Sequence, residues 1–252
     1  MDGPLRGPHG CVFRPSARKR PSCSIAPAAP PLRERLLAAA LQTESLARPP
    51  APHTTADRAS DLLAAASALS YLRSTRASDA PEAARLADRM RGTMTELAAS
   101  QNDDGGWAWV PGQTKRPSDR LTSAHVAWAL ASAEPLGLLP DPSAAEKAAN
   151  YLAGEFAKID SGDLDTRAAV LHALSTRRKA SFEQANALNR LRQGLSSVAL
   201  AYLSLTFSNL DRGALADEVV GVLLPKSKTE AAEPGSPPRR YWDGSPNSPW
   251  CR

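Results

Sequence analysis

Two adjacent carboxylates, Asp103 and Asp104, come closest to a catalytic pair in residue type and spacing. A carboxylic acid can protonate a substrate when an apolar pocket keeps it neutral. These two carboxylates instead precede Gly105 and Gly106 in a polar turn, where water would keep both of them ionised. We therefore interpret the pair as part of a turn or a helix cap, and acid catalysis is the alternative.

Histidines at positions 125 and 172 fall within apolar segments of the chain. As zinc ligands they would need two further ligands nearby and a partner on the second ring nitrogen. The three cysteines, Cys11, Cys23 and Cys251, lie far from both histidines in the sequence, and their spacing fits no metal motif. We therefore expect no metal and no cofactor. We expect His125 and His172 to be hydrogen-bonded side chains that line the centre of a helical domain.

Acidic and basic residues recur together at the starts of two apolar segments, as Asp119-Arg120 and as Asp165-x-Arg167. An aspartate that caps a helix, with a surface ion pair beside it, explains this pattern. Binding of an anion or a peptide at the mouth of the domain is the functional alternative. The residues that we predict as a binding set are Asp119, Arg120, His125, Trp128, Asp165, Arg167, His172 and Tyr202.

The chain of 252 residues has a net charge of +5, and much of the excess lies in a Pro-rich stretch between residues 14 and 35. We do not expect nucleic-acid binding, because no basic helix face is interleaved with aromatic residues. No apolar run approaches the roughly 18 residues that a membrane span needs. The N-terminus has no apolar core of a signal peptide.

Apolar periodicity predicts an all-α fold. The segments 121–131, 168–174 and 198–205 are apolar almost all round, and each is followed by a segment with a single apolar stripe. A helix that is apolar all round needs neighbours on opposite faces. An inner layer of such helices, covered by an outer layer of one-sided helices, would supply them. We therefore predict irregular helix-pair repeats.

The distribution of proline divides the chain into three parts. Residues 1–56 are rich in Pro and Arg and have almost no periodicity, so we predict a disordered segment. Residues 57–225 contain the helical domain. Residues 226–252 are predicted to form a flexible tail, in which Trp242 and Trp250 stand among polar residues.

One turn carries a recognisable motif. Arg91-Gly92, Leu97, Gln101, Gly105 and Trp107 resemble the glutamine–tryptophan repeat of the terpenoid cyclase and prenyltransferase superfamily, whose fold is an α/α toroid. In that superfamily the glutamine and tryptophan connect the end of an outer helix to the start of the next helix. The resemblance implies a partial α/α toroid. It assigns a structural role to Gln101, Asp103, Asp104, Gly105, Gly106, Trp107 and Trp109.

Within the superfamily, the chain is most similar to the thioester-domain region of bacterial α2-macroglobulin-like proteins. The similarity rests on the order of several short motifs: Asn102 to Trp109, Ser118 to Thr122, Arg192 to Ser196, and Tyr241 to Trp250. The Cys-Gly-Glu-Gln thioester motif of that family is absent from the sequence. The family also continues into further helices beyond the last motif, so we expect this chain to be a fragment or a decayed copy.

The resemblance implies a non-catalytic interaction module derived from an endopeptidase inhibitor, located outside the cytoplasm. Its partner would be a protein, either a protease or the remaining domains of a larger macroglobulin-like chain. The alternative is a fragment of a terpene cyclase or prenyltransferase-like enzyme, which predicts a deep central chamber with aromatic walls and a buried carboxylate. A truncated product without separate activity is a third possibility. The sequence indicates neither the target nor the oligomeric state.

Overall fold

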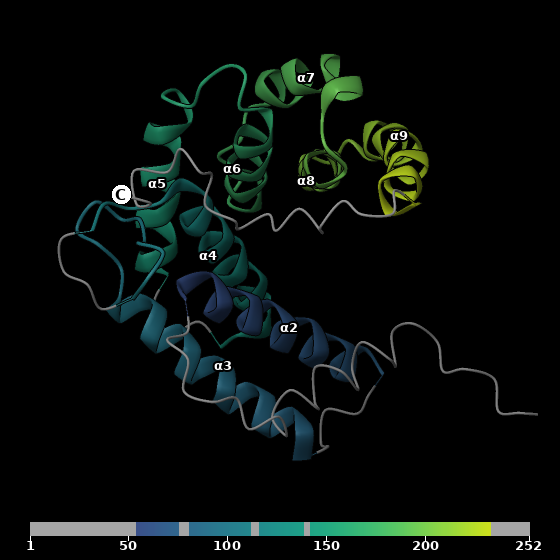
Figure 1. Ribbon diagram of the computed structural model, residues 1–252. Helices are drawn as coiled ribbons and strands as arrows, with labels where there is room; N and C mark the ends of the chain where they lie inside the picture. The colour runs from purple at the N-terminus through teal and green to yellow at the C-terminus, as the bar shows by residue number, and fades with distance from the viewer. Residues whose placement is uncertain (1–53, 76–80, 112–115, 139–141, 233–252) are drawn as a thin grey trace, which may run out of the picture.

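The computed structural model describes residues 54–75, 81–111, 116–138 and 142–232 (Figure 1). Most of the segment predicted to be disordered (1–56) and most of the predicted tail (226–252) lie outside these ranges. Thr54 to Ala56, the end of the first segment, cap and begin a helix instead. Every regular element within them is helical, which confirms the predicted all-α fold. The α-helices are α2 (Thr55–Ser74), α3 (Pro81–Ala99), α4 (Arg120–Ala133), α5 (Ser143–Phe156), α6 (Leu164–Thr176), α7 (Phe182–Arg190), α8 (Ser197–Asn209) and α9 (Gly213–Ala232). Two short 3-10 helices complete the set, η1 (Glu134–Leu136) and η2 (Arg192–Gly194).

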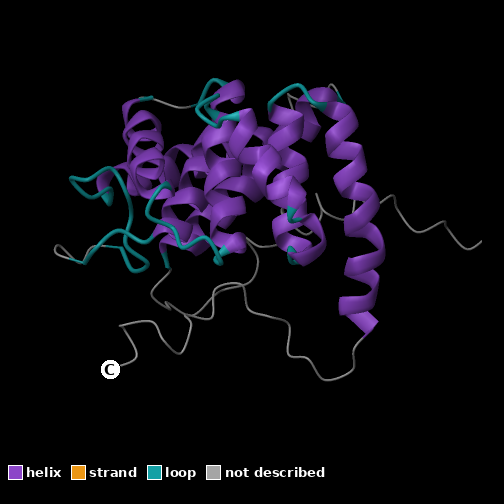
Figure 2. Ribbon diagram, turned by 90° about the horizontal axis from the view of Figure 1, so that it is seen from above, coloured by secondary structure: helices purple, strands orange, loops and turns teal. Residues whose placement is uncertain are grey.

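The helices form two layers. Helices α2, α4, α6 and α8 pack successively against one another and make the inner layer, which curves across Figure 1. Helices α3, α5, α7 and α9 lie outside it. Helix α5 contacts both α4 and α6, and α7 contacts both α6 and α8 (Figure 1). Seen from above in Figure 2, loops join these helices. The result is an arc of four helix pairs, the partial α/α toroid that the sequence predicts.

Burial follows from the composition of each helix. In α6, every residue from Ala168 to Ser175 is buried, because α4 and α8 flank it and α5 and α7 cover its back. In the outer helix α3, a stripe including Leu86, Met90 and Met94 is buried while Arg85 and Arg91 are exposed. Inner helices therefore bury most of their surface and outer helices bury one stripe.

Helix starts agree with the prediction in one case and differ in another. Asp119 caps α4 as expected, since its Oδ1 accepts a hydrogen bond of 2.7 Å from the backbone N–H of Thr122. The prediction that Asp165 caps α6 was wrong, because the cap is Asp163 and the helix begins at Leu164. Asp165 therefore lies in the first turn of α6.

The last helix continues beyond the boundary predicted at residue 225. Helix α9 runs through Pro225 to Ala232. The ammonium group of Lys226 donates a hydrogen bond to the carbonyl of Leu195, which ties this part of α9 to the loop before α8. Within the described ranges, each helix is too short or too polar to cross a bilayer.

Candidate functional site

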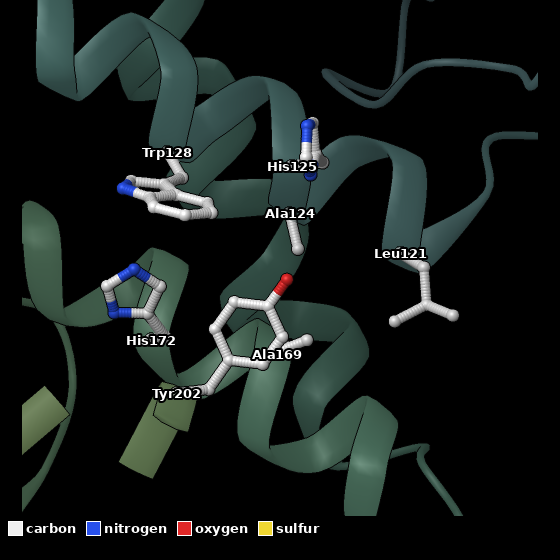
Figure 3. A pocket seen from close by; sticks show the side chains of 7 residues that line it. All are labelled: Leu121, Ala124, His125, Trp128, Ala169, His172 and Tyr202. Carbon is white, nitrogen blue, oxygen red and sulfur yellow. The ribbon is translucent and has the colours of Figure 1, made fainter. Parts of the chain in front are cut away.

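A pocket opens among three inner helices. It is lined by residues of α4, α6 and α8, as Figure 3 shows: Leu121, Ala124, His125, Trp128, Ala169, His172 and Tyr202. The pocket holds about 230 Å³, counting space that is open to solvent. Four members of the predicted binding set, His125, Trp128, His172 and Tyr202, thus come together although they span 78 positions of the sequence (202 − 125 + 1).

Trp128 is the centre of a cluster of rings. Its indole meets His172 at a centroid distance of 5.0 Å and Tyr202 at 6.0 Å, with interplanar angles of 76° and 84°. His125 approaches the same indole at 5.9 Å and 79°. His172 and Tyr202 stack at 5.4 Å. Such edge-to-face and stacked pairs each contribute about 0.5–1.5 kcal/mol beyond burial, so the packing holds the rings in place.

The two histidines in the pocket are neutral at physiological pH. Burial disfavours the charged imidazolium and lowers the pKa of His125 to about 4 and that of His172 to about 4. Burial also raises the pKa of the Tyr202 hydroxyl. All seven residues that line the pocket are therefore uncharged near pH 7.

The histidines differ in their hydrogen bonds. The Nε2 atom of His125 lies 3.1 Å from the hydroxyl of Ser60 on α2. Both ring nitrogens of His172 are without a hydrogen-bond partner among the described residues, although only 3% of this residue is exposed. An unpaired buried polar group costs roughly 1–3 kcal/mol, so the imidazole of His172 lowers the free energy of unfolding.

The charged members of the predicted set lie at helix starts and contact nearby groups. Arg120 donates to Glu155 at 2.8 Å. Arg167 lies over the ring of Phe156, with its guanidinium carbon 5.0 Å from the centroid. The carboxylate of Asp165 accepts a hydrogen bond of 2.7 Å from the hydroxyl of Ser196, which is the N-cap of α8. None of Asp119, Arg120, Asp165 and Arg167 is among the residues that line the pocket.

The turn after α3 joins three helices. Gln101 Nε2 donates hydrogen bonds of 2.9 Å to the carbonyl of Gly105 and to that of Ala144 at the start of α5. Trp107 is fully buried, and its indole N–H donates to the carbonyl of Leu97 at 2.7 Å. Gln101 thus links the end of α3 to the start of α5, and the indole of Trp107 satisfies a carbonyl in the last turn of α3.

The carboxylates of this turn are exposed. Asp104 Oδ1 accepts hydrogen bonds from the backbone N–H of Gly106 at 2.9 Å and from the hydroxyl of Ser118 at 2.7 Å. Asp103 is exposed beside it. Trp109 is half-buried, and its carbonyl accepts a hydrogen bond of 2.9 Å from the backbone N–H of Thr55. These contacts hold the turn against α2 and the start of α4.

Glycine is required at position 105 of this turn. Its φ of +90° lies in a region that L side chains rarely adopt, and a Cβ there would come within 2.6 Å of the carbonyl oxygen of Lys147. At Gly106 a Cβ would come within 2.5 Å of Ser118. The turn therefore needs Gly105 for its close approach to α5 and Gly106 for its close approach to Ser118, just before α4.

The groups that line the pocket are apolar or neutral near pH 7. The pocket-lining residues include no carboxylate, and the hydroxyl of Ser60 is the group that His125 Nε2 contacts, at 3.1 Å. Across the part of the chain that the structure describes, no three His, Cys, Asp or Glu side chains gather as a metal ion would require. The enclosed part of the pocket is about 10 Å³, far below the roughly 300–1,000 Å³ of typical small-molecule sites. The geometry suits an apolar contact.

Comparison with known proteins identifies the same architecture elsewhere. No family model matches the sequence, and no curated protein matches it. Among solved structures, a mutant of Salmonella alpha-2-macroglobulin and native alpha-2-macroglobulin from E. coli each align with a TM-score of 0.58 and 15% identity over 76% of this chain. A piece of the E. coli protein from domain MG7 to the C-terminus aligns with a TM-score of 0.57 and 16% identity over 77% of the chain.

These alignments define the class of the fold. The chain is a two-layered all-α array that shares its fold with a part of bacterial alpha-2-macroglobulin. It spans 13% and 12% of the two longer chains and 31% of the E. coli piece. At these identities the alignments establish the fold.

Several residues that contribute to the site cannot be recognised from the sequence. Ala124 and Ala169 line the pocket as small residues that leave room between the rings, and Ser60 reaches His125 from a helix 65 positions away in sequence. Alanines are frequent throughout these helices, so residue type does not single out these two. Only the packing of α2 and α6 on α4 identifies them.

Proposed function

We propose that this chain is a non-catalytic protein-interaction module, related to the thioester-domain region of macroglobulin-like endopeptidase inhibitors but without the thioester. The shared fold supports the relationship. The absence of Cys-Gly-Glu-Gln from the sequence supports the lack of covalent chemistry. By the same relationship, the module acts outside the cytoplasm, and its partner is a protease or another domain of a macroglobulin-like protein.

The observation that carries the proposal is the character of the pocket. Its walls are uncharged rings and small apolar residues, and the space between them is far too small for an isoprenoid substrate. A cyclase that protonates its substrate needs a buried acid, and the pocket lining contains none. A partner that places an apolar side chain against the pocket would bury the exposed parts of Trp128 and Tyr202. Tryptophan and tyrosine are enriched among the residues that contribute most binding energy at protein interfaces.

Binding to purified proteases tests the proposal. The full chain, immobilised at low density, is exposed to a panel of serine, cysteine and metalloproteases whose active sites are blocked. We expect at least one to bind reversibly, and we expect Tyr202→Ser to weaken that binding at least tenfold by removing one wall of the pocket. Leu224→Ser is the matched control, because Leu224 is 55% exposed on α9 and does not line the pocket.

Two results would contradict the proposal. One is the absence of binding to every protease and to macroglobulin domains supplied separately. The other is binding that Tyr202→Ser leaves unchanged while circular dichroism shows the variant to be folded. Turnover of an isoprenoid diphosphate by the chain would instead favour the cyclase alternative.

A further inference from the structure

His172 is a buried polar side chain whose ring nitrogens have no hydrogen-bond partner among the described residues, although only 3% of the residue is exposed. Buried polar groups in folded proteins are almost always hydrogen-bonded, either to protein or to ordered water. The ring centroids of Trp128 and Tyr202 lie 5.0 Å and 5.4 Å from that of the imidazole. A rotation that exposed the imidazole to solvent would break both ring contacts, so a partner for it has to come to the pocket.

The space beside this imidazole has the size of one water molecule. His172 lines the pocket together with Trp128 and Tyr202, as Figure 3 shows. The enclosed part of the pocket is about 10 Å³. One water molecule needs about 10–15 Å³ of such space. The inner part of the pocket therefore has room for one small group and for nothing larger.

The polar groups of the pocket suit water as a ligand. Three polar side chains line the pocket, those of His125, His172 and Tyr202. A buried water typically makes about three hydrogen bonds to such groups. A neutral imidazole carries one N–H donor and one acceptor nitrogen. Because water both donates and accepts, it can pair with whichever ring nitrogen of His172 faces the pocket.

Small ions suit the pocket less well than water does. A buried anion needs a paired positive charge, and no Lys or Arg lines the pocket. A zinc ion needs at least three protein ligands, and no three His, Cys, Asp or Glu side chains gather in the described ranges. The chemistry of the lining therefore favours a neutral ligand that can form hydrogen bonds.

We propose that the pocket binds one water molecule, hydrogen-bonded to a ring nitrogen of His172 and to at least one of the other two polar side chains that line it. This water offsets the cost of burying the imidazole without a protein partner, and it joins α6 to α4 or α8. Displacing an ordered water by a group that cannot make its hydrogen bonds loses affinity. An apolar side chain of the proposed protein partner therefore binds best when it covers Trp128 and Tyr202 from outside and leaves the water in place.

Magnetic relaxation dispersion of the water oxygen, measured on the full chain alone, tests this inference. The method counts water molecules that stay bound for longer than the protein takes to tumble. His172→Phe removes the hydrogen-bonding ring nitrogens and keeps an aromatic ring, so we expect the variant to bind one long-lived water fewer than the wild type. Leu224→Ser is the matched control, because Leu224 is 55% exposed on α9 and does not line the pocket. It should leave the count unchanged, and circular dichroism verifies that both variants fold.

A high-resolution crystal structure of the wild type gives a second readout that depends on no variant. We expect a water within hydrogen-bond distance of Nδ1 or Nε2 of His172. Equal counts of long-lived water in the wild type and a folded His172→Phe would overturn the inference. So would a crystal structure in which a protein group pairs with the His172 nitrogen that faces the pocket. Neither measurement uses a partner protein, so a failure of the protease-binding assay leaves this inference standing, and the reverse also holds.

Discussion

At the scale of single residues, the pocket combines two neutral histidines with an indole and a phenol. The same burial that makes its surface apolar makes its histidines costly to protonate. Lowering the pH should therefore reduce the stability of the fold.

We expect the free energy of unfolding to fall as the pH is lowered from about 6.5 to about 4. In this window the unfolded chain binds protons at His125 and His172, and the folded chain, in which both pKa values are about 4, does not. Below pH 4 both states are protonated and this loss stops. The expected loss is about 1–3 kcal/mol for each histidine.

Urea unfolding at pH 7, 6, 5 and 4 measures this dependence. Between pH 6.5 and 5 the ion-paired carboxylate Glu146, whose pKa the ammonium of Lys179 and the guanidinium of Arg177 lower to about 2, stays charged in both states. His172→Phe should remove about half of the slope in this window. A slope that is the same in wild type and in the variant would show that His172 is not protonated on unfolding in the way we infer.

The sequence indicates the pocket only in part. His125, Trp128, His172 and Tyr202 can be grouped because each sits in a helix that is apolar all round. Periodicity does not show that the rings touch, because ring contacts depend on the depth at which α4, α6 and α8 pack. The charged pairs at the helix starts were grouped with the rings, but they contact local partners and do not line the pocket.

At the scale of the elements, the helix caps show where local pattern is sufficient. Asp119 precedes the first apolar residue of its helix by two positions, and it is the cap. Before α6 two aspartates compete, Asp163 and Asp165, and the pattern does not decide between them. The cap is Asp163. The carboxylate of Asp165 instead accepts a hydrogen bond from the hydroxyl of Ser196.

Alanine substitutions separate these two roles. Asp163→Ala should lower the free energy of unfolding by about 0.5–2 kcal/mol, the usual cost of losing an N-cap. Asp165→Ala should remove a partly exposed hydrogen bond between α6 and the start of α8 without removing the cap, and it should cost less. Thermal or urea unfolding at pH 7 gives both values. A larger loss for Asp165→Ala would contradict the cap assignment.

Helix α2 shows where local pattern is insufficient. Its leucines at helical spacing predict a helix, but they do not indicate the layer to which it belongs. Helix α2 is the first inner helix because it packs on both α3 and α4, and because Ser60 reaches His125 from it. Whether a helix belongs to the inner or the outer layer depends on which helices flank it. The sequence of a single helix does not show which helices these are.

At the scale of the whole molecule, the inner helices form an arc that the outer helices cover. The turn at Gln101 and Trp107 fixes the spacing between successive pairs, and the pocket forms where three inner helices converge. Helix α8 contributes Tyr202 to this pocket. The three helices that line the pocket thus come from three successive helix pairs of the arc.

The measurement that most directly tests this account is hydrogen–deuterium exchange of the full chain, alone and bound to a protein partner found in the protease-binding assay. The account predicts that binding slows exchange in residues 121–128, 169–172 and 198–205, which surround the pocket, and leaves the outer helices α3 and α7 unchanged. Protection confined to α3 or α7, with the pocket segments unaffected, would contradict the claim that the inner face of the arc is the binding surface.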